Sequence, residues 1–131
     1  MRFEVEKKAP VENVKEAKIR AVLNSLRNYG PSSFASITDD IGNYLQVAGG
    51  GLHCMLERYD AKDNKFYRAY LDSKSKIFSD GTILAFGGGE LKLLSDEWVS
   101  ISIVIEAFVA FLNHKDLPSK IKWRDITSNF Q

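Results

Sequence analysis

Apolar and polar residues alternate in several short stretches of the chain, with the period of two that is typical of half-buried strands. The pattern begins at residues 2–6, where apolar and acidic side chains fall on opposite sides. Between residues 33 and 72, stretches rich in aromatic and β-branched residues are separated by Asp, Gly and Asn, which predicts strands over 34–38, 44–48, 52–59 and 66–71. Four strands within about forty residues leave room only for short connections, so we expect antiparallel pairing.

Two longer stretches follow a helical period instead. Over residues 11–28 the apolar positions gather on one face, Pro10 suits the first turn of a helix, and Tyr29-Gly30-Pro31 suits its end. A second helix is predicted over residues 98–113, with a broad apolar surface and with Ser95 as its N-cap.

Glycine-rich segments punctuate the second half of the chain. Residues 76–78 and 82–86 are predicted to form a hairpin through Ser79-Asp80-Gly81. Gly87-Gly88-Gly89 fits either a bend within a long strand or a loop between two short strands. A last strand is predicted over residues 120–127.

Together these elements predict a single α+β domain over residues 1–131. We expect a predominantly antiparallel sheet of about six strands, with the two main helices packed against one of its faces.

Composition and charge exclude several classes of protein. Eighteen Lys and Arg against seventeen Asp and Glu leave a net charge of +1, which disfavours dedicated nucleic-acid binding. The single cysteine, Cys54, favours a reducing compartment, and the charged N-terminal residues do not resemble a signal peptide, so we expect a cytoplasmic protein. The apolar stretch over residues 98–112 is shorter than the roughly 20 residues that cross a bilayer, so no membrane insertion is expected.

The sequence contains no arrangement that specifies a reaction, a metal or a cofactor. Neither glycine triplet has the flanking residues of a phosphate-binding loop, and the spacings of zinc sites and of the serine-hydrolase elbow are missing. His53 and Cys54 are adjacent on a predicted strand, so we expect their side chains to point to opposite faces. We therefore expect no catalytic residues, no metal and no cofactor.

Tyrosine, arginine and aspartate concentrate around the middle strands, in the mixture that protein interfaces use for anchoring contacts. Polar and aromatic groups on loops and strand faces are readily exposed. The sequence therefore predicts a partner-binding patch made of Asp39, Asp40, Tyr59, Asp60, Tyr67, Arg68 and Tyr70.

Two regions of the chain resemble the Imm-type immunity proteins of bacterial polymorphic toxin systems. The first comprises GNYLQVAGG at residues 42–50 and CMLE at 54–57, and the second comprises EAFVAFL at 106–112, Leu117-Pro118 and IKWRDIT at 121–127. The resemblance implies an α+β protein, made beside a toxin, that binds the toxin domain and blocks it without being an enzyme. The near-neutral charge departs from the acidic surplus of many nuclease inhibitors, so a highly cationic nuclease is a less expected target.

Two other functions remain open at this stage. One is a small ligand-binding protein or enzyme with a pocket between the sheet and the second helix, which would use Glu106, His53 or His114. The other is an adaptor or subunit of a larger assembly. Exposed strand edges could also pair with a second copy of the chain, so a homodimer is a further expectation.

Overall fold

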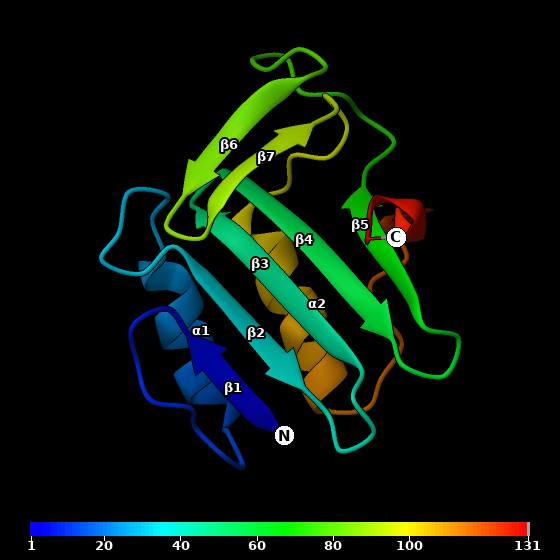
Figure 1. The fold of residues 1–131 in the computed structure, drawn as a ribbon. Helices are drawn as coiled ribbons and strands as arrows, with labels where there is room; N and C mark the ends of the chain where they lie inside the picture. Colours follow the sequence, from blue (N-terminus) through cyan, green and yellow to red (C-terminus); the bar gives the residue numbers. More distant parts are fainter. Residues whose placement is uncertain (131) are drawn as a thin grey trace.

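The computed structural model describes residues 1–130 and has an α+β fold, as the sequence predicts. Six antiparallel strands form the main sheet in the order β1-β2-β3-β4-β5-β8 (Figure 1). Their bounds are Arg2–Val5, Phe34–Thr38, Tyr44–Gly50, His53–Asp60, Lys65–Tyr70 and Lys122–Asp125. A short 3-10 helix, η1, follows over Thr127–Phe130.

Helices α1 (Glu16–Ser25) and α2 (Ile101–Leu112) lie together behind the sheet in Figure 1. They bury one face of it, because alternate residues of the central strands, such as Val47 and Leu56, share a core with Leu23 and Phe108. Trp123 is partly buried against the same core. We call this side the helix face, and we call the opposite side of the sheet the open face.

A separate hairpin of β6 (Thr82–Phe86) and β7 (Gly89–Leu93) packs over one end of the open face (Figure 1). A second, smaller core joins Leu84 and Leu93 of the hairpin to Ala48 and Met55 of the sheet. Because β6 ends at Phe86 and β7 begins at Gly89, Gly87-Gly88-Gly89 connects two short strands and is not a bend within one long strand.

The first helix is shorter than predicted. Val11 is not helical but pairs with Phe3, and each backbone N–H of this pair donates to the other residue's carbonyl at 2.9 Å. This bridge keeps Val11 paired with β1, and a turn follows over residues 12–13, so the helix begins only at Glu16. The prediction over residues 11–28 was wrong at both ends, at the start because of the bridge to Phe3 and at the end because Leu26 is extended and closes the helix at Ser25.

Two predictions around the hairpin were also wrong. Residues 76–78 form a turn rather than a strand, since the Ser75 hydroxyl accepts the N–H groups of Ile77 and Phe78 at 3.1 and 3.0 Å. Ser95 is not the N-cap of α2, which is Ser100. Val99, which lies between Ser95 and Ser100, pairs with Cys54 of β4, so the helix begins only after this residue.

No helix within residues 1–130 has both the length and the apolar character needed to cross a bilayer.

Candidate protein-binding face

A row of four aromatic rings crosses the open face at right angles to the strands. The strand register places Tyr44 opposite Tyr59 and Tyr59 opposite Phe66, and η1 adds Phe130 at the end of the row. Successive ring centroids lie 5.3, 4.7 and 4.2 Å apart. Cross-strand aromatic neighbours at these distances stabilise one another and present a stiff apolar surface. We call these four residues the aromatic row.

A groove of about 470 Å³ runs between the aromatic row and the hairpin. Its floor is formed by side chains of β3, β4 and β5, and its far wall is β7. The residues that line it are Tyr44, Gln46, Met55, Glu57, Arg68, Phe86, Glu90, Leu91, Lys92, Asn129 and Phe130.

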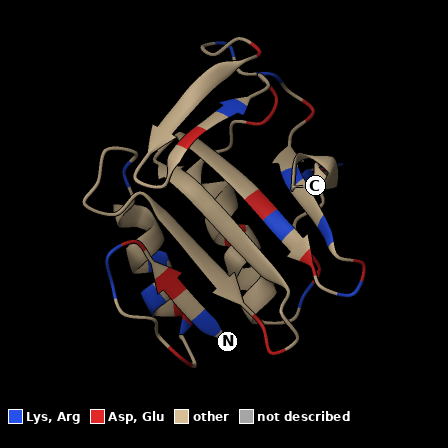
Figure 2. Ribbon diagram, in the orientation of Figure 1, with Lys and Arg blue, Asp and Glu red and all other residues tan. Residues whose placement is uncertain are grey.

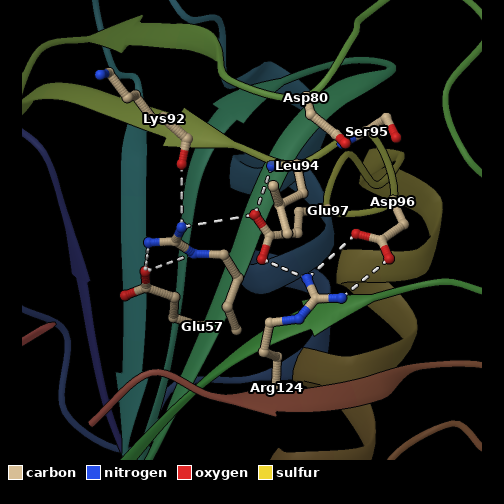
Figure 3. A network of polar contacts seen from close by, with 9 residues as sticks. Glu57, Asp80, Lys92, Leu94, Ser95, Asp96, Glu97 and Arg124 are labelled. Carbon is tan, nitrogen blue, oxygen red and sulfur yellow. Dashed lines mark hydrogen bonds and ion pairs between the residues drawn. The ribbon is translucent and has the colours of Figure 1, made fainter. Parts of the chain in front are cut away.

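Buried ion pairs fix the floor of this groove (Figure 3). Arg68 donates to Glu57 Oε1 from Nη2 at 2.7 Å and from Nε at 3.2 Å, and Arg68 Nη1 donates to the Lys92 carbonyl of β7 at 3.3 Å. The Arg68 side chain is only 10% exposed. A guanidinium paired on two sides in this way has little freedom to move.

The same network continues to β8. Glu97 lies 3.7 Å from Arg68 Nη1 and accepts a hydrogen bond from Arg124 Nη1 at 2.7 Å, while Arg124 also forms a two-pronged contact with Asp96 at 3.0 and 3.2 Å (Figure 3). Hydrogen bonding to Asp96 is the main cause that raises the pKa of Arg124 above its ordinary value. Two guanidinium groups and three carboxylates thus join β4, β5, β7, β8 and the turn before α2.

The structure separates the residues of the predicted patch. Tyr59 belongs to the aromatic row, and Tyr70 lies on the same face under Arg124, whose guanidinium carbon is 4.4 Å from the ring centroid. Tyr67 lies at the alternate position of β5 from Tyr70, so its side chain is on the helix face, beneath Arg58. Arg68 differs from the expected exposed anchor, because its charge is used inside the ion-pair network.

The three predicted aspartates lie in two turns that meet at one end of the sheet. The β2–β3 turn holds Asp39 and Asp40, the β4–β5 turn begins at Asp60, and the side-chain oxygen of Asn43 accepts the Ala61 N–H at 2.8 Å between the turns. Asp39 accepts the N–H groups of its own turn, at 3.0 Å from Ile41 and 2.9 Å from Asn43. Asp60 does the same in its own turn. Asp40 is exposed.

Sequence reasoning missed Tyr44, Phe66 and Phe130 of the row and the acidic partners Glu57 and Glu97. The signal for the first two was present, because both occupy the polar-side positions of strands whose alternate residues are apolar. Phe130 gave no such signal, since it reaches the row only through the 3-10 turn after β8.

The residues expected to line a pocket between the sheet and α2 do not converge. The Glu106 side chain is 52% exposed and pairs with Lys120 at 2.9 Å. His53 contacts Phe78 and Trp98 with ring centroids 5.0 and 6.4 Å away, on the hairpin side of the sheet. His114 lies beyond the end of α2.

Cys54 is buried in the core on the helix face, as the alternation with His53 predicts. Burial raises the pKa of its thiol to about 12, so the thiolate needed for nucleophilic chemistry is not available at neutral pH. Within residues 1–130, no group of three or more His, Cys, Asp or Glu side chains is arranged to hold a metal ion.

No protein-family model matches the sequence, and searches of curated proteins and of solved structures also give no match.

Proposed function

We propose that this chain is an immunity protein that binds a cognate bacterial toxin domain in the cytoplasm and neutralises it by stoichiometric contact. The observation that carries the proposal is the aromatic row, a set of partly exposed rings fixed on a rigid sheet. Aromatic residues that lose little conformational freedom on binding are the common anchors of protein interfaces.

The distribution of charge around the row supports a protein partner. Strands β2 and β3 carry no Lys, Arg, Asp or Glu, so that part of the open face is uncharged, while charged residues lie in the middle of β4, in the turns and on the outer strands (Figure 2). An area with few charges that is bordered by polar and charged side chains is the usual composition of a protein interface. The proposed target is therefore a protein surface with apolar contacts at its centre.

Co-expression with the product of the adjacent upstream reading frame tests this function. We expect the neighbouring protein to be toxic alone, and we expect this chain to restore growth and to co-purify with it in a fixed ratio. A harmless neighbour, or rescue without a complex, would contradict immunity by binding.

A matched pair of variants locates the interface. Tyr59→Ala removes the middle of the aromatic row, and Tyr29→Ala removes a tyrosine that is 83% exposed in the loop after α1. We expect Tyr59→Ala to weaken the complex by about 30-fold, as truncation of an anchoring residue does, and Tyr29→Ala to leave the dissociation constant unchanged. Circular dichroism of both variants checks that the fold is retained.

Binding of a small ligand in the groove is a second candidate, because about 470 Å³ falls within the volume range of ligand pockets. Here we expect the free protein to gain thermal stability from a small molecule, and we expect Tyr44→Ala to remove that gain. If the chain acts by neutralising a toxin, we expect it to do so without a small-molecule ligand.

A further inference from the structure

One charged side chain on the helix face is left without a counter-charge. Arg58 of β4 lies over the ring of Tyr67, with its guanidinium carbon 4.1 Å from the centroid, and 5.1 Å from the ring centroid of Trp123. None of the ion pairs within residues 1–130 includes Arg58. Its Nε atom is buried and has no hydrogen-bond partner among those residues.

This state is unusual for a buried arginine donor. Buried N–H groups are nearly always paired, and an unpaired donor on a charged group is costly, so each such group calls for an explanation. Arg68 and Arg124 of the same sheet illustrate the ordinary case, since each is held by carboxylates at 2.7 Å. The rings of Tyr67 and Trp123 hold the Arg58 guanidinium in place but offer no acceptor for its Nε–H.

Arg58 also lines a cavity of about 170 Å³ at the end of the sheet. Phe111 and Leu117, which lie at and beyond the end of α2, form its apolar side. The acidic residue that lines the cavity is Asp60, whose carboxylate accepts the N–H groups of Lys62 and Asp63 at 3.0 and 3.3 Å. The volume is below the roughly 300 Å³ at which pockets for whole small-molecule ligands begin, and it suits a single functional group.

We propose that the Arg58 cavity receives the carboxylate of an acidic side chain from the bound protein partner. A carboxylate in the cavity can accept from the Nη–H groups of Arg58 and supplies the missing counter-charge, while the Nε–H remains covered by the protein itself. The neighbouring Asp60 favours a singly charged planar anion over a doubly charged phosphate. The assignment of the carboxylate to the protein partner rests on the proposed function, whereas the preference of the cavity for a carboxylate does not.

Acetate titration of the free, ¹⁵N-labelled protein tests the cavity itself. The arginine Nε–Hε signals are followed by NMR at constant ionic strength, and Arg58→Lys identifies the signal of Arg58. We expect that signal alone to shift with saturation, while those of Arg68 and Arg124, whose guanidinium groups are already paired, stay in place. No saturable shift, or equal shifts at all three arginines, would overturn the proposal. Inorganic phosphate, titrated in parallel, should bind at least tenfold more weakly, and equal binding would refute the preference for carboxylate.

A second experiment tests where the carboxylate comes from. In the complex with the upstream gene product, we expect Arg58→Gln to raise the dissociation constant at least tenfold. Arg20→Gln serves as the matched control, because Arg20 is an arginine whose side chain is 52% exposed on α1. Acetate binding combined with an unchanged complex would show that the cavity serves a free carboxylate and would overturn the assignment to the partner. If the complex forms but acetate does not bind, the cavity proposal fails and the proposed function stands.

Discussion

At the scale of single residues, Gly50 shows how closely the chain after α1 approaches the sheet. A Cβ atom built on Gly50 would overlap the carbonyl group of Leu26 and would lie 2.9 Å from the backbone N of Arg27. These contacts are with backbone, which cannot swing aside as the end of a side chain can. No other residue type fits there without displacing the segment that leaves α1.

We therefore expect Gly50→Ala to lower the free energy of unfolding by about 3 kcal/mol, the upper part of the usual range for overpacking. Gly51→Asn is the matched control, since Gly51 has a φ of +64°, which asparagine tolerates, and has open space around it. Its expected cost is below about 1 kcal/mol. Urea denaturation of both variants measures the difference, and equal losses would contradict the close-approach argument.

The sequence identifies Gly49-Gly50-Gly51 only as a connection between two predicted strands, because the preference of glycine for turns is a local property. The need for glycine at position 50 arises from a contact with Leu26, which belongs to another element. The burial of Arg68 could not be predicted for the same reason. Its place on a strand follows from the local pattern, whereas its burial depends on Glu97, which comes from the turn before α2.

At the scale of elements, Glu97 connects segments that local structure alone would leave separate. Its side chain is 3% exposed, it accepts the Leu94 N–H at 2.7 Å, and it pairs with arginines of β5 and β8. Glu106 is the contrasting acid, since it lies on α2 with a single partner, Lys120, and both side chains are half exposed.

We expect Glu97→Ala to lower the free energy of unfolding by about 2–3 kcal/mol, because it removes a buried carboxylate from two arginines, which keep only Glu57 and Asp96 as partners. Glu106→Ala should cost less than about 1 kcal/mol, as exposed ion pairs do. Thermal and urea denaturation measure both variants. A cost for Glu97→Ala as small as that for Glu106→Ala would show that the network contributes little to stability.

Elements were predictable from the sequence where their cause is local. The alternation of residues in β2 to β5 predicts these strands to within two residues at each end, and the apolar face of α2 predicts that helix with a start three residues too early and an end one residue too late. The start of α1 and the turn at 76–78 were not predictable, because a bridge to Phe3 and a side-chain turn at Ser75 decide them. The hairpin lies over the open face through contacts between segments far apart in the chain, so the groove beneath it could not be foreseen.

At the scale of the whole molecule, two acidic side chains, Glu6 and Asp80, join segments far apart in the chain, and a third, Asp125, holds the turn that follows it. Glu6, after β1, accepts the N–H and the hydroxyl of Ser33, both at 2.7 Å, and the Ser33 hydroxyl in turn accepts the Gly87 N–H of the hairpin turn at 2.7 Å. Asp80 accepts the Ser95 N–H at 2.7 Å, and Asp125 accepts the Thr127 N–H at 2.9 Å. Hydrogen bonding to Ser33, to Ser95 and to the side chain and backbone of Thr127 is the main cause that lowers the pKa of Glu6, Asp80 and Asp125, respectively, below the ordinary value.

A lowered pKa in the folded state gives a definite pH dependence. A carboxylate of this kind stabilises the fold above its unfolded-state pKa of about 4, and the contribution is lost as the pH falls through the lower pKa of the folded state. We therefore expect the urea midpoint to be constant between about pH 7 and 5 and to fall steadily below about pH 4.

Ser33→Ala should make that fall shallower, because it removes a hydrogen bond that holds the pKa of Glu6 down. Ser32→Ala is the matched control, since the Ser32 hydroxyl donates to the backbone carbonyl of Glu6 rather than to its carboxylate. The same slope in both variants would exclude the Glu6 carboxylate as a source of the acid sensitivity.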